Sequence, residues 1–178
     1  MINMVNKLRF NIAKFGAKIA SQVSKLGFGS GNNLPGYVFY KVAGKEALKD
    51  LAHEMNVGPI LITGTNGKTT TTTLLIKLLS CDTEIRKSFE SNTIHAITTG
   101  ILKGSGDIGV FEYGIRNKIY GIPDTVQRLI DPVGVVYTTI SREHSQVAGV
   151  KNPFDEYVDA KSPVSYTHLR AHETLSDL

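Results

Sequence analysis

Large apolar residues recur at steps of three and four near the start of the chain. The series is Leu8, Ile12, Phe15, Ile19, Val23 and Leu26. This spacing draws one apolar stripe along a helix of about six turns, with lysines on its flanks. We favour packing of the stripe on the following domain over contact of residues 4–26 with a membrane surface. A secretory signal is excluded, because Lys14 and Lys18 break the apolar centre that it would need.

A Gly-rich stretch follows this helix. Residues 27–36 contain four glycines together with Ser30, Asn32, Asn33 and Pro35, a composition typical of a loop. Residues 1–36 are therefore predicted to form an amphipathic helix and a linker, separate from a domain over residues 37–162.

From residue 45 onward, helical periodicity alternates with short apolar runs. The periodic segments predict helices over residues 45–55, 68–79, 94–102 and 124–130. The apolar runs predict strands over residues 59–63, 108–112 and 133–138. Strands that are apolar on both faces and alternate with helices indicate a mostly parallel sheet covered on both sides. We therefore predict an α/β fold, in which ligands bind at the carboxyl ends of the strands.

Composition places the chain among soluble globular domains, with 41% hydrophobic and 20% charged residues. Cys81 is the single cysteine. This excludes an internal disulfide framework and a Cys-rich zinc site, and it fits a reducing cytoplasm. No apolar run approaches the ~20 residues that a membrane span needs.

The net charge of +4 is unevenly distributed. Residues 1–45 carry seven basic side chains and no acidic one, whereas the rest of the chain carries 13 basic and 16 acidic groups. The basic character belongs to the N-terminal helix, so it gives no reason to expect nucleic acid as a partner.

One predicted strand runs directly into a Gly-rich turn and then a helix. The segment is Ile60-Leu61-Ile62-Thr63-Gly64-Thr65-Asn66-Gly67-Lys68-Thr69-Thr70. Glycines let successive backbone N–H groups face phosphate oxygens, and the helix N-terminus adds partial positive charge. In such P-loops the lysine reaches the β- and γ-phosphates and the next hydroxyl ligates Mg²⁺, roles that fall here to Lys68 and Thr69. The general pattern has an earlier glycine at the position of Ile62, so this loop is a variant.

That variant, Gly64-Thr65-Asn66-Gly67-Lys68-Thr69-Thr70, resembles the nucleotide loop of the Mur ligases, ATP-dependent amide ligases that build cell-wall peptides. Three later segments resemble motifs of that family in the same order. They are Val110-Phe111-Glu112, Thr138-Thr139-Ile140-Ser141-Arg142-Glu143-His144 and Tyr157-Val158-Asp159-Ala160-Lys161. The middle one has Thr139 and Glu143 where the family has Asn and Asp. Four ordered motifs are more specific than one loop.

The resemblance implies a reaction and a set of site residues. ATP and Mg²⁺ would be the cofactors, and a carboxylate would be activated as an acyl phosphate for attack by an amine. The implied metal ligands are Thr69, Glu112, His144 and Ser91. The implied catalytic residues are Lys68, His144 and Lys161, the last of these as a carbamate.

The arrangement of residues 1–36 resembles one branch of the family. A basic helix, a Gly-rich linker and Leu34-Pro35-Gly36 precede the loop, with no separate uridine-nucleotide domain between them. This is similar to the branch that contains MurT and the archaeal pseudomurein peptide ligases. It implies a cell-wall peptide precursor as one partner, an amino acid or ammonia as the amine donor, and an amidotransferase partner for MurT-like proteins.

Two other functions compete with the ligase. One is a different P-loop NTPase or kinase, although the chain has neither the Asn-Lys-x-Asp run that reads guanine nor an Arg-rich lid. The other is a nucleotide-binding membrane-surface protein, in which the basic helix is the working part.

The end of the chain departs from the family pattern. Residues 163–178 resemble the translation of a transposase adapter from sequencing libraries, so we expect an artefactual tail and no function for His168 or His172. The natural sequence would then be cut near Lys161. We accordingly expect this chain, as written, to lack ligase activity.

Overall fold

A computed structural model describes residues 4–25, 32–88, 93–114 and 129–139. Four parallel strands in this part of the chain form one sheet in the order β2-β3-β1-β4. The strands are β1 Gly58–Thr63, β2 Ile85–Ser88, β3 Ile108–Glu112 and β4 Gly134–Tyr137. β1 therefore lies between β3 and β4, and this places the segment that follows it at the centre of the sheet edge.

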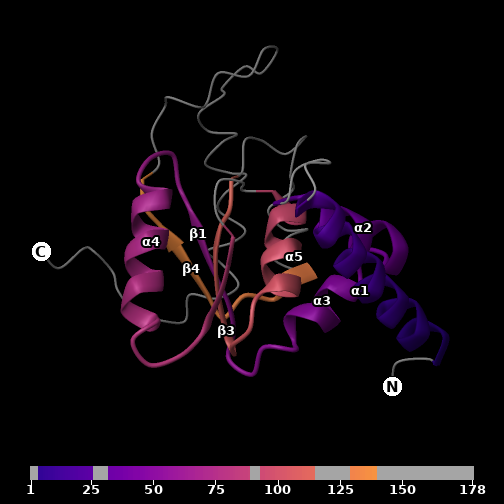
Figure 1. Cartoon of the computed structure of the whole chain (residues 1–178). Coiled ribbons are helices and arrows are strands. Elements are labelled where there is room, and N and C mark those ends of the chain that lie inside the picture. Colours follow the sequence, from indigo (N-terminus) through magenta and orange to yellow (C-terminus); the bar gives the residue numbers. More distant parts are fainter. Residues whose placement is uncertain (1–3, 26–31, 89–92, 115–128, 140–178) are drawn as a thin grey trace, which may run out of the picture.

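The helices are α1 Met4–Lys25, α2 Leu34–Ala43, α3 Ala47–Ala52, α4 Lys68–Leu79 and α5 Ile94–Lys103. α4 covers one face of the sheet, and α5 with α3 covers the other (Figure 1). α2 packs on α5, and α1 packs on α2 as the outermost helix. The prediction of an α/β fold with helices on both faces is confirmed.

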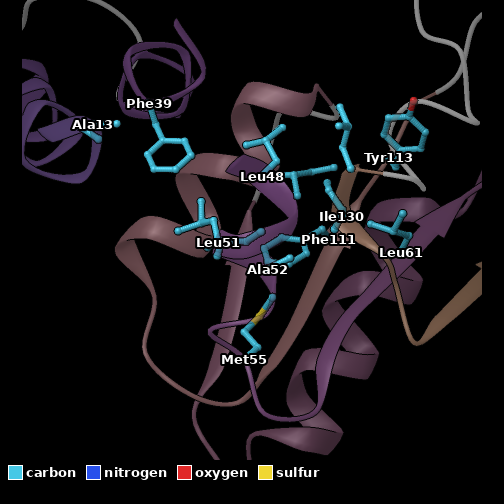
Figure 2. Packing of buried hydrophobic residues seen from close by; sticks show 14 residues of the cluster. Ala13, Phe39, Leu48, Leu51, Ala52, Met55, Leu61, Phe111, Tyr113 and Ile130 are labelled. Carbon is cyan, nitrogen blue, oxygen red and sulfur yellow. The ribbon is translucent and has the colours of Figure 1, made fainter. Parts of the chain in front are cut away.

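The apolar residues of the strands divide between two cores because successive side chains point to opposite faces of the sheet. Leu61 and Phe111 face the α5 side, where they join a large buried cluster that includes Leu48 and Leu51 (Figure 2). Ile62 and Val110 face α4 and form a smaller cluster with Ile76. β1 and β3 are therefore packed on both faces, and these contacts fix the positions of the strand ends from which the next segments start.

β2 was not predicted from the sequence. Its four residues include Arg86 and Lys87, so it lacks the solid apolar run of the other strands. Within the described sheet it is an edge strand, where charged side chains are common.

α2 corrects the prediction of a loop over residues 27–36, which is wrong for Leu34–Gly36. Pro35 lies in the first turn of α2, where a missing N–H costs nothing. Gly36 lies where α2 meets α5, and a Cβ there would collide with the backbone carbonyl of His95. The helix crosses the predicted boundary between residues 36 and 37. Pro35 and Gly36, two of the residues that suggested a linker, therefore serve the start and the packing of a helix.

α1 packs through a face other than the predicted one. The buried residues of α1 are Ala13, Ala17 and Ala20, at 0%, 2% and 8% exposure. Gly16 faces Val38 of α2. In contrast, the predicted stripe is exposed, with fractions of 62% for Leu8, 53% for Ile12, 66% for Phe15, 49% for Ile19 and 37% for Val23. The prediction that the stripe packs on the following domain is wrong, because small side chains let the two helices approach more closely.

Other predicted segments have mixed outcomes. α4 and β3 have the predicted bounds. The predicted helix over residues 45–55 is shorter, as α3. Of the predicted helix over residues 124–130, only Leu129 and Ile130 are described, and both are helical. The described helices include no candidate for a membrane-spanning segment.

Candidate functional site

Three segments meet at the carboxyl edge of the sheet. The loop of residues 64–67 follows β1, Glu112 ends β3, and Thr138 follows β4. The parallel register pairs Ile62 with Glu112 and Thr63 with Tyr137. The loop therefore has an acidic residue on one side and threonines on the other.

Two glycines give the loop its backbone path. Gly64 has φ 145° and Gly67 has φ 82°, values that other residues rarely adopt. A Cβ on Gly64 would collide with the Thr138 hydroxyl and would lie 2.9 Å from the backbone nitrogen of Thr139. Gly67 is the N-cap of α4. The first N–H groups of α4, those of Lys68, Thr69 and Thr70, lack acceptors within the helix, and phosphate oxygens can supply them.

Lys68 is held across this loop. Its ammonium group donates hydrogen bonds to the carbonyl oxygens of Gly64 and Thr65, both at 3.0 Å. These contacts fix the positive charge against the loop backbone, where the phosphates of a nucleotide would also lie.

Thr69 and Glu112 are brought together from α4 and β3. The Thr69 hydroxyl donates a hydrogen bond to Oε2 of Glu112 at 2.9 Å. Neighbouring ligands of an octahedral Mg²⁺, with metal–oxygen bonds of about 2.05 Å, also lie about 2.9 Å apart. This pair of oxygens therefore fits two adjacent positions of a magnesium site.

Thr138 and Thr139 tie the loop to β4. The Thr138 hydroxyl donates to the Asn66 carbonyl at 2.5 Å, and the Thr139 hydroxyl accepts from the Asn66 N–H at 3.0 Å. The N–H of Thr65 donates to the carbonyl of Thr139 at 2.6 Å. No role was predicted for these threonines from the sequence, although they begin one of the four motifs that resemble the Mur ligases. Their contacts show that they support the loop.

Tyr113 and Tyr137 lie beside the site, after Glu112 and at the end of β4. The Tyr113 N–H donates to the carbonyl of Ile62 at 2.8 Å. Burial raises the pKa of Tyr113, and it raises the pKa of Tyr137 to about 12. Both phenols are therefore neutral at physiological pH, and they add no negative charge near the loop.

Three predicted site residues, Ser91, His144 and Lys161, lie outside the described residues. Of the other predicted residues, Gly64 to Thr70 form the loop and the first turn of α4, and Glu112 lies beside them. Within the described ranges, no group of three His, Cys, Asp or Glu residues is close enough to hold a metal ion. A metal held here by Thr69 and Glu112 would take its other ligands from elsewhere.

The family model described as "Mur ligase middle domain" matches residues 62–174. This span begins in β1 and includes the loop, Glu112 and the two threonines. The chain belongs to the Mur ligase family. The match also runs into residues 163–178, and the artefactual origin of that tail remains a prediction. A search of curated proteins finds no match.

Two solved structures share the fold of this Mur ligase domain. Crystal structure I of MurF from Acinetobacter baumannii is 23% identical, with a TM-score of 0.56, and the match covers 69% of this chain and 28% of that one. Crystal structure II of the same protein is 19% identical, with a TM-score of 0.57 and coverage of 73% and 27%. The chain thus spans less than a third of the length of either MurF chain.

Proposed function

We propose that this chain is the nucleotide-binding part of an ATP-dependent carboxylate–amine ligase of cell-wall biosynthesis. The observation that carries the proposal is the hydrogen bond between Thr69 of α4 and Glu112 at the end of β3. Thr69 directly follows Lys68, which is held against the loop after β1. Membership of the Mur ligase family supports the reaction class.

The loop residues have complementary tasks in this function. Lys68 exchanges one or both of its carbonyl contacts for oxygens of the β- and γ-phosphates. The N–H groups at the start of α4 donate to the same phosphates. Thr69 and Glu112 hold Mg²⁺, which when bound neutralises charge on the triphosphate. Together these groups reduce the repulsion that an incoming carboxylate meets.

The reaction itself has two steps. A substrate carboxylate oxygen attacks the γ-phosphorus, and the bond between this phosphorus and the oxygen that bridges to the β-phosphate breaks. The products of this step are ADP and an acyl phosphate. A neutral amine then attacks the acyl carbon, the bond from that carbon to the phosphate oxygen breaks, and the amine loses one proton to the released phosphate or to water, which gives an amide. By the resemblance of their motifs, His144 would add a metal ligand and Lys161 would act as a carbamate. Ser91 would add another ligand, because the matching region of the family approaches the metal.

The finer assignment concerns the branch of the family. The basic α1, followed by α2 with its Leu34-Pro35-Gly36 start, favours a MurT-like or pseudomurein ligase. Such a protein would use a cell-wall peptide precursor and an amino acid or ammonia, the latter from an amidotransferase partner.

Nucleotide binding to the 178-residue chain tests the first part of the proposal. A fluorescent ATP analogue is titrated with Mg²⁺ into the wild type and into Lys68→Ala, with Lys77→Ala at the other end of α4 as a matched control. We expect at least tenfold weaker binding for Lys68→Ala and an unchanged Kd for Lys77→Ala. Equal binding by all three would contradict the site, and preferential displacement by GTP would favour another NTPase.

The role of Glu112 is tested by metal dependence. Glu112→Gln keeps a hydrogen-bond partner for Thr69 but removes the charge that favours Mg²⁺. We expect its ATP affinity to respond little to added Mg²⁺, whereas the wild-type affinity rises severalfold. In a longer protein that includes this chain, hydroxylamine trapping of an acyl phosphate tests the reaction, and ATP hydrolysis without a trapped acyl group would contradict it.

A further inference from the structure

α1 has one apolar face that is largely exposed in the described part of the molecule. Leu8, Ile12, Phe15 and Ile19 are each about half or more exposed, and Val23 is 37% exposed. The helix lies at the outside of the molecule, on the opposite side from α4 (Figure 1). Five large apolar side chains in one row on an outer surface mark an interaction site.

The attachment of α1 to the domain does not use this face. Ala13, Ala17 and Ala20 are buried, and Phe10 packs edge-to-face on Phe39 of α2 with ring centroids 5.4 Å apart. A partner could therefore bind the exposed stripe without displacing these described contacts, which hold the helix in place.

The charges beside the exposed face indicate the chemistry of that partner. On a helix of 3.6 residues per turn, Lys7, Lys14, Lys18 and Lys25 form one row beside the apolar stripe. No acidic residue occurs among residues 1–45. Lys14 donates to Glu54 at 2.7 Å, so part of its charge is already balanced. The exposed surface of α1 therefore has the apolar stripe on one side and the lysine row on the other.

A groove continues the basic row. It has a volume of about 750 Å³, and Lys14, Lys18, Lys25 and Lys103 line it together with Phe15 of the stripe. None of the described residues that line this groove is acidic. Cationic groups next to exposed aromatic and aliphatic side chains match a surface of anionic headgroups above acyl chains.

We propose that α1 docks this protein on an anionic lipid membrane, lying parallel to its surface. The stripe of Leu8, Ile12, Phe15, Ile19 and Val23 enters the region between headgroups and acyl chains. The lysine row and its groove contact lipid phosphates. A second copy of the chain suits this face less well, because a two-fold contact between antiparallel α1 helices would place both lysine rows on the same side of the contact.

Vesicle sedimentation of the whole chain tests the docking. Vesicles of phosphatidylcholine with 30% phosphatidylglycerol are compared with phosphatidylcholine alone, in low salt and in 0.5 M salt. The stripe variant is Ile12→Ser/Phe15→Ser/Ile19→Ser. Its matched control is Leu74→Ser/Leu78→Ser on α4, where the two leucines are 56% and 70% exposed. Circular dichroism checks that each variant is folded.

We expect the wild type and the α4 control to bind the anionic vesicles alike. The stripe variant should bind at least tenfold more weakly, and high salt should weaken wild-type binding because the lysine contacts are screened. No binding by the wild type, or equal binding by the stripe variant, would overturn the proposal.

The absence of tryptophan gives a second, direct readout. Phe15→Trp places a single fluorophore in the stripe, and Leu78→Trp places one on α4. We expect a blue shift with anionic vesicles only for Trp at position 15.

A blue-shifted spectrum at that position before lipid is added, in this chain or in a longer protein that contains it, would show that protein already covers the face. A wild-type chain that is dimeric in solution, together with a stripe variant that is monomeric, would identify a second copy as the occupant. Either result would overturn the membrane proposal.

Discussion

The loop after β1 and the helix α1 both have strong sequence patterns, but the two patterns differ in what they determine. At the loop, Gly64 and Gly67 adopt backbone angles that only glycine takes readily. The resulting loop conformation lets the Asn66 carbonyl accept a hydrogen bond from Thr138. At α1, the apolar stripe correctly predicts a helix, yet the face that packs is the one with Ala13 and Ala17. A pattern that fixes backbone conformation therefore predicts more than a pattern that only suggests a buried face.

Gly64→Ala should have the largest effect in this comparison. The alanine must adopt φ 145° and its Cβ must displace Thr138, so we expect a loss of about 3 kcal/mol from backbone strain and broken hydrogen bonds. Urea denaturation measures the loss.

Two other glycines separate the causes of this effect. Gly44 has φ 88° in open space, so Gly44→Ala reports strain alone. At Gly134 a Cβ meets nothing within 4 Å, so Gly134→Ala should be nearly neutral. If Gly64→Ala costs no more than Gly44→Ala, then the contact with Thr138 does not constrain the loop.

Ala17→Leu should have the next largest effect. Ala17 is 2% exposed between α1 and α2, and a larger side chain there must push the helices apart, at about 1–3 kcal/mol. Gln22→Leu adds a leucine at an exposed position of the same helix and should cost little. Thermal unfolding compares the two, and equal stabilities would mean that α1 does not pack through its alanine face.

Acidification should weaken the contact between α2 and α5. α1 packs on α2, so this contact also holds α1 on the domain. His95 of α5 lies against the rings of Tyr37 and Tyr40 of α2, and its Nδ1 is buried without a hydrogen-bond partner. Burial, and secondarily the charge of Lys41, lowers the pKa of His95 below its usual 6.5. Between this lowered pKa and pH 6.5, the unfolded chain then binds more protons than the folded one.

The stability from neutral His95 is therefore fully present above pH 6.5 and is lost as the pH falls through the lowered value. We expect a smaller effect than that of Ala17→Leu, because the imidazole is only partly buried. Urea midpoints at pH 7.5 and 5 measure it, and His95→Leu should reduce the difference. An unchanged pH dependence in that variant would assign the effect to other groups.

Phe15→Ala should have the smallest effect on stability. The ring is 66% exposed, so its removal should change the free energy of unfolding by no more than about 0.5 kcal/mol. Thermal unfolding in lipid-free buffer measures this change. A loss of about 3 kcal/mol would instead show that the stripe is buried in solution, and it would restore the packing predicted from the sequence.

Much of the fold could be predicted because it depends on local chemistry. The bounds of α4 and β3 follow from helical periodicity after a Gly turn and from one solid apolar run. β2 escaped prediction because Arg86 and Lys87 hide an edge strand. α2 escaped because Pro35 and Gly36 are typical of loops until a neighbouring helix requires a close approach.

The candidate site shows the same division. Lys68 and Thr69 follow from the loop sequence, and Glu112 was predicted through its resemblance to a family motif. That Thr69 and Glu112 lie 2.9 Å apart is a consequence of the pairing of β1 with β3. The support from Thr138 and Thr139 depends on the pairing of β1 with β4, which no local pattern specifies.

The sequence by itself determined the elements that depend on backbone freedom and on the alternation of apolar residues: the strand, the glycine turn and the helix that follows it. The tertiary structure alone decided which side of α1 is buried and which side chains meet at the loop. The reason is that backbone angles are set by the residues themselves, whereas packing depends on the shape of the surface that each element meets.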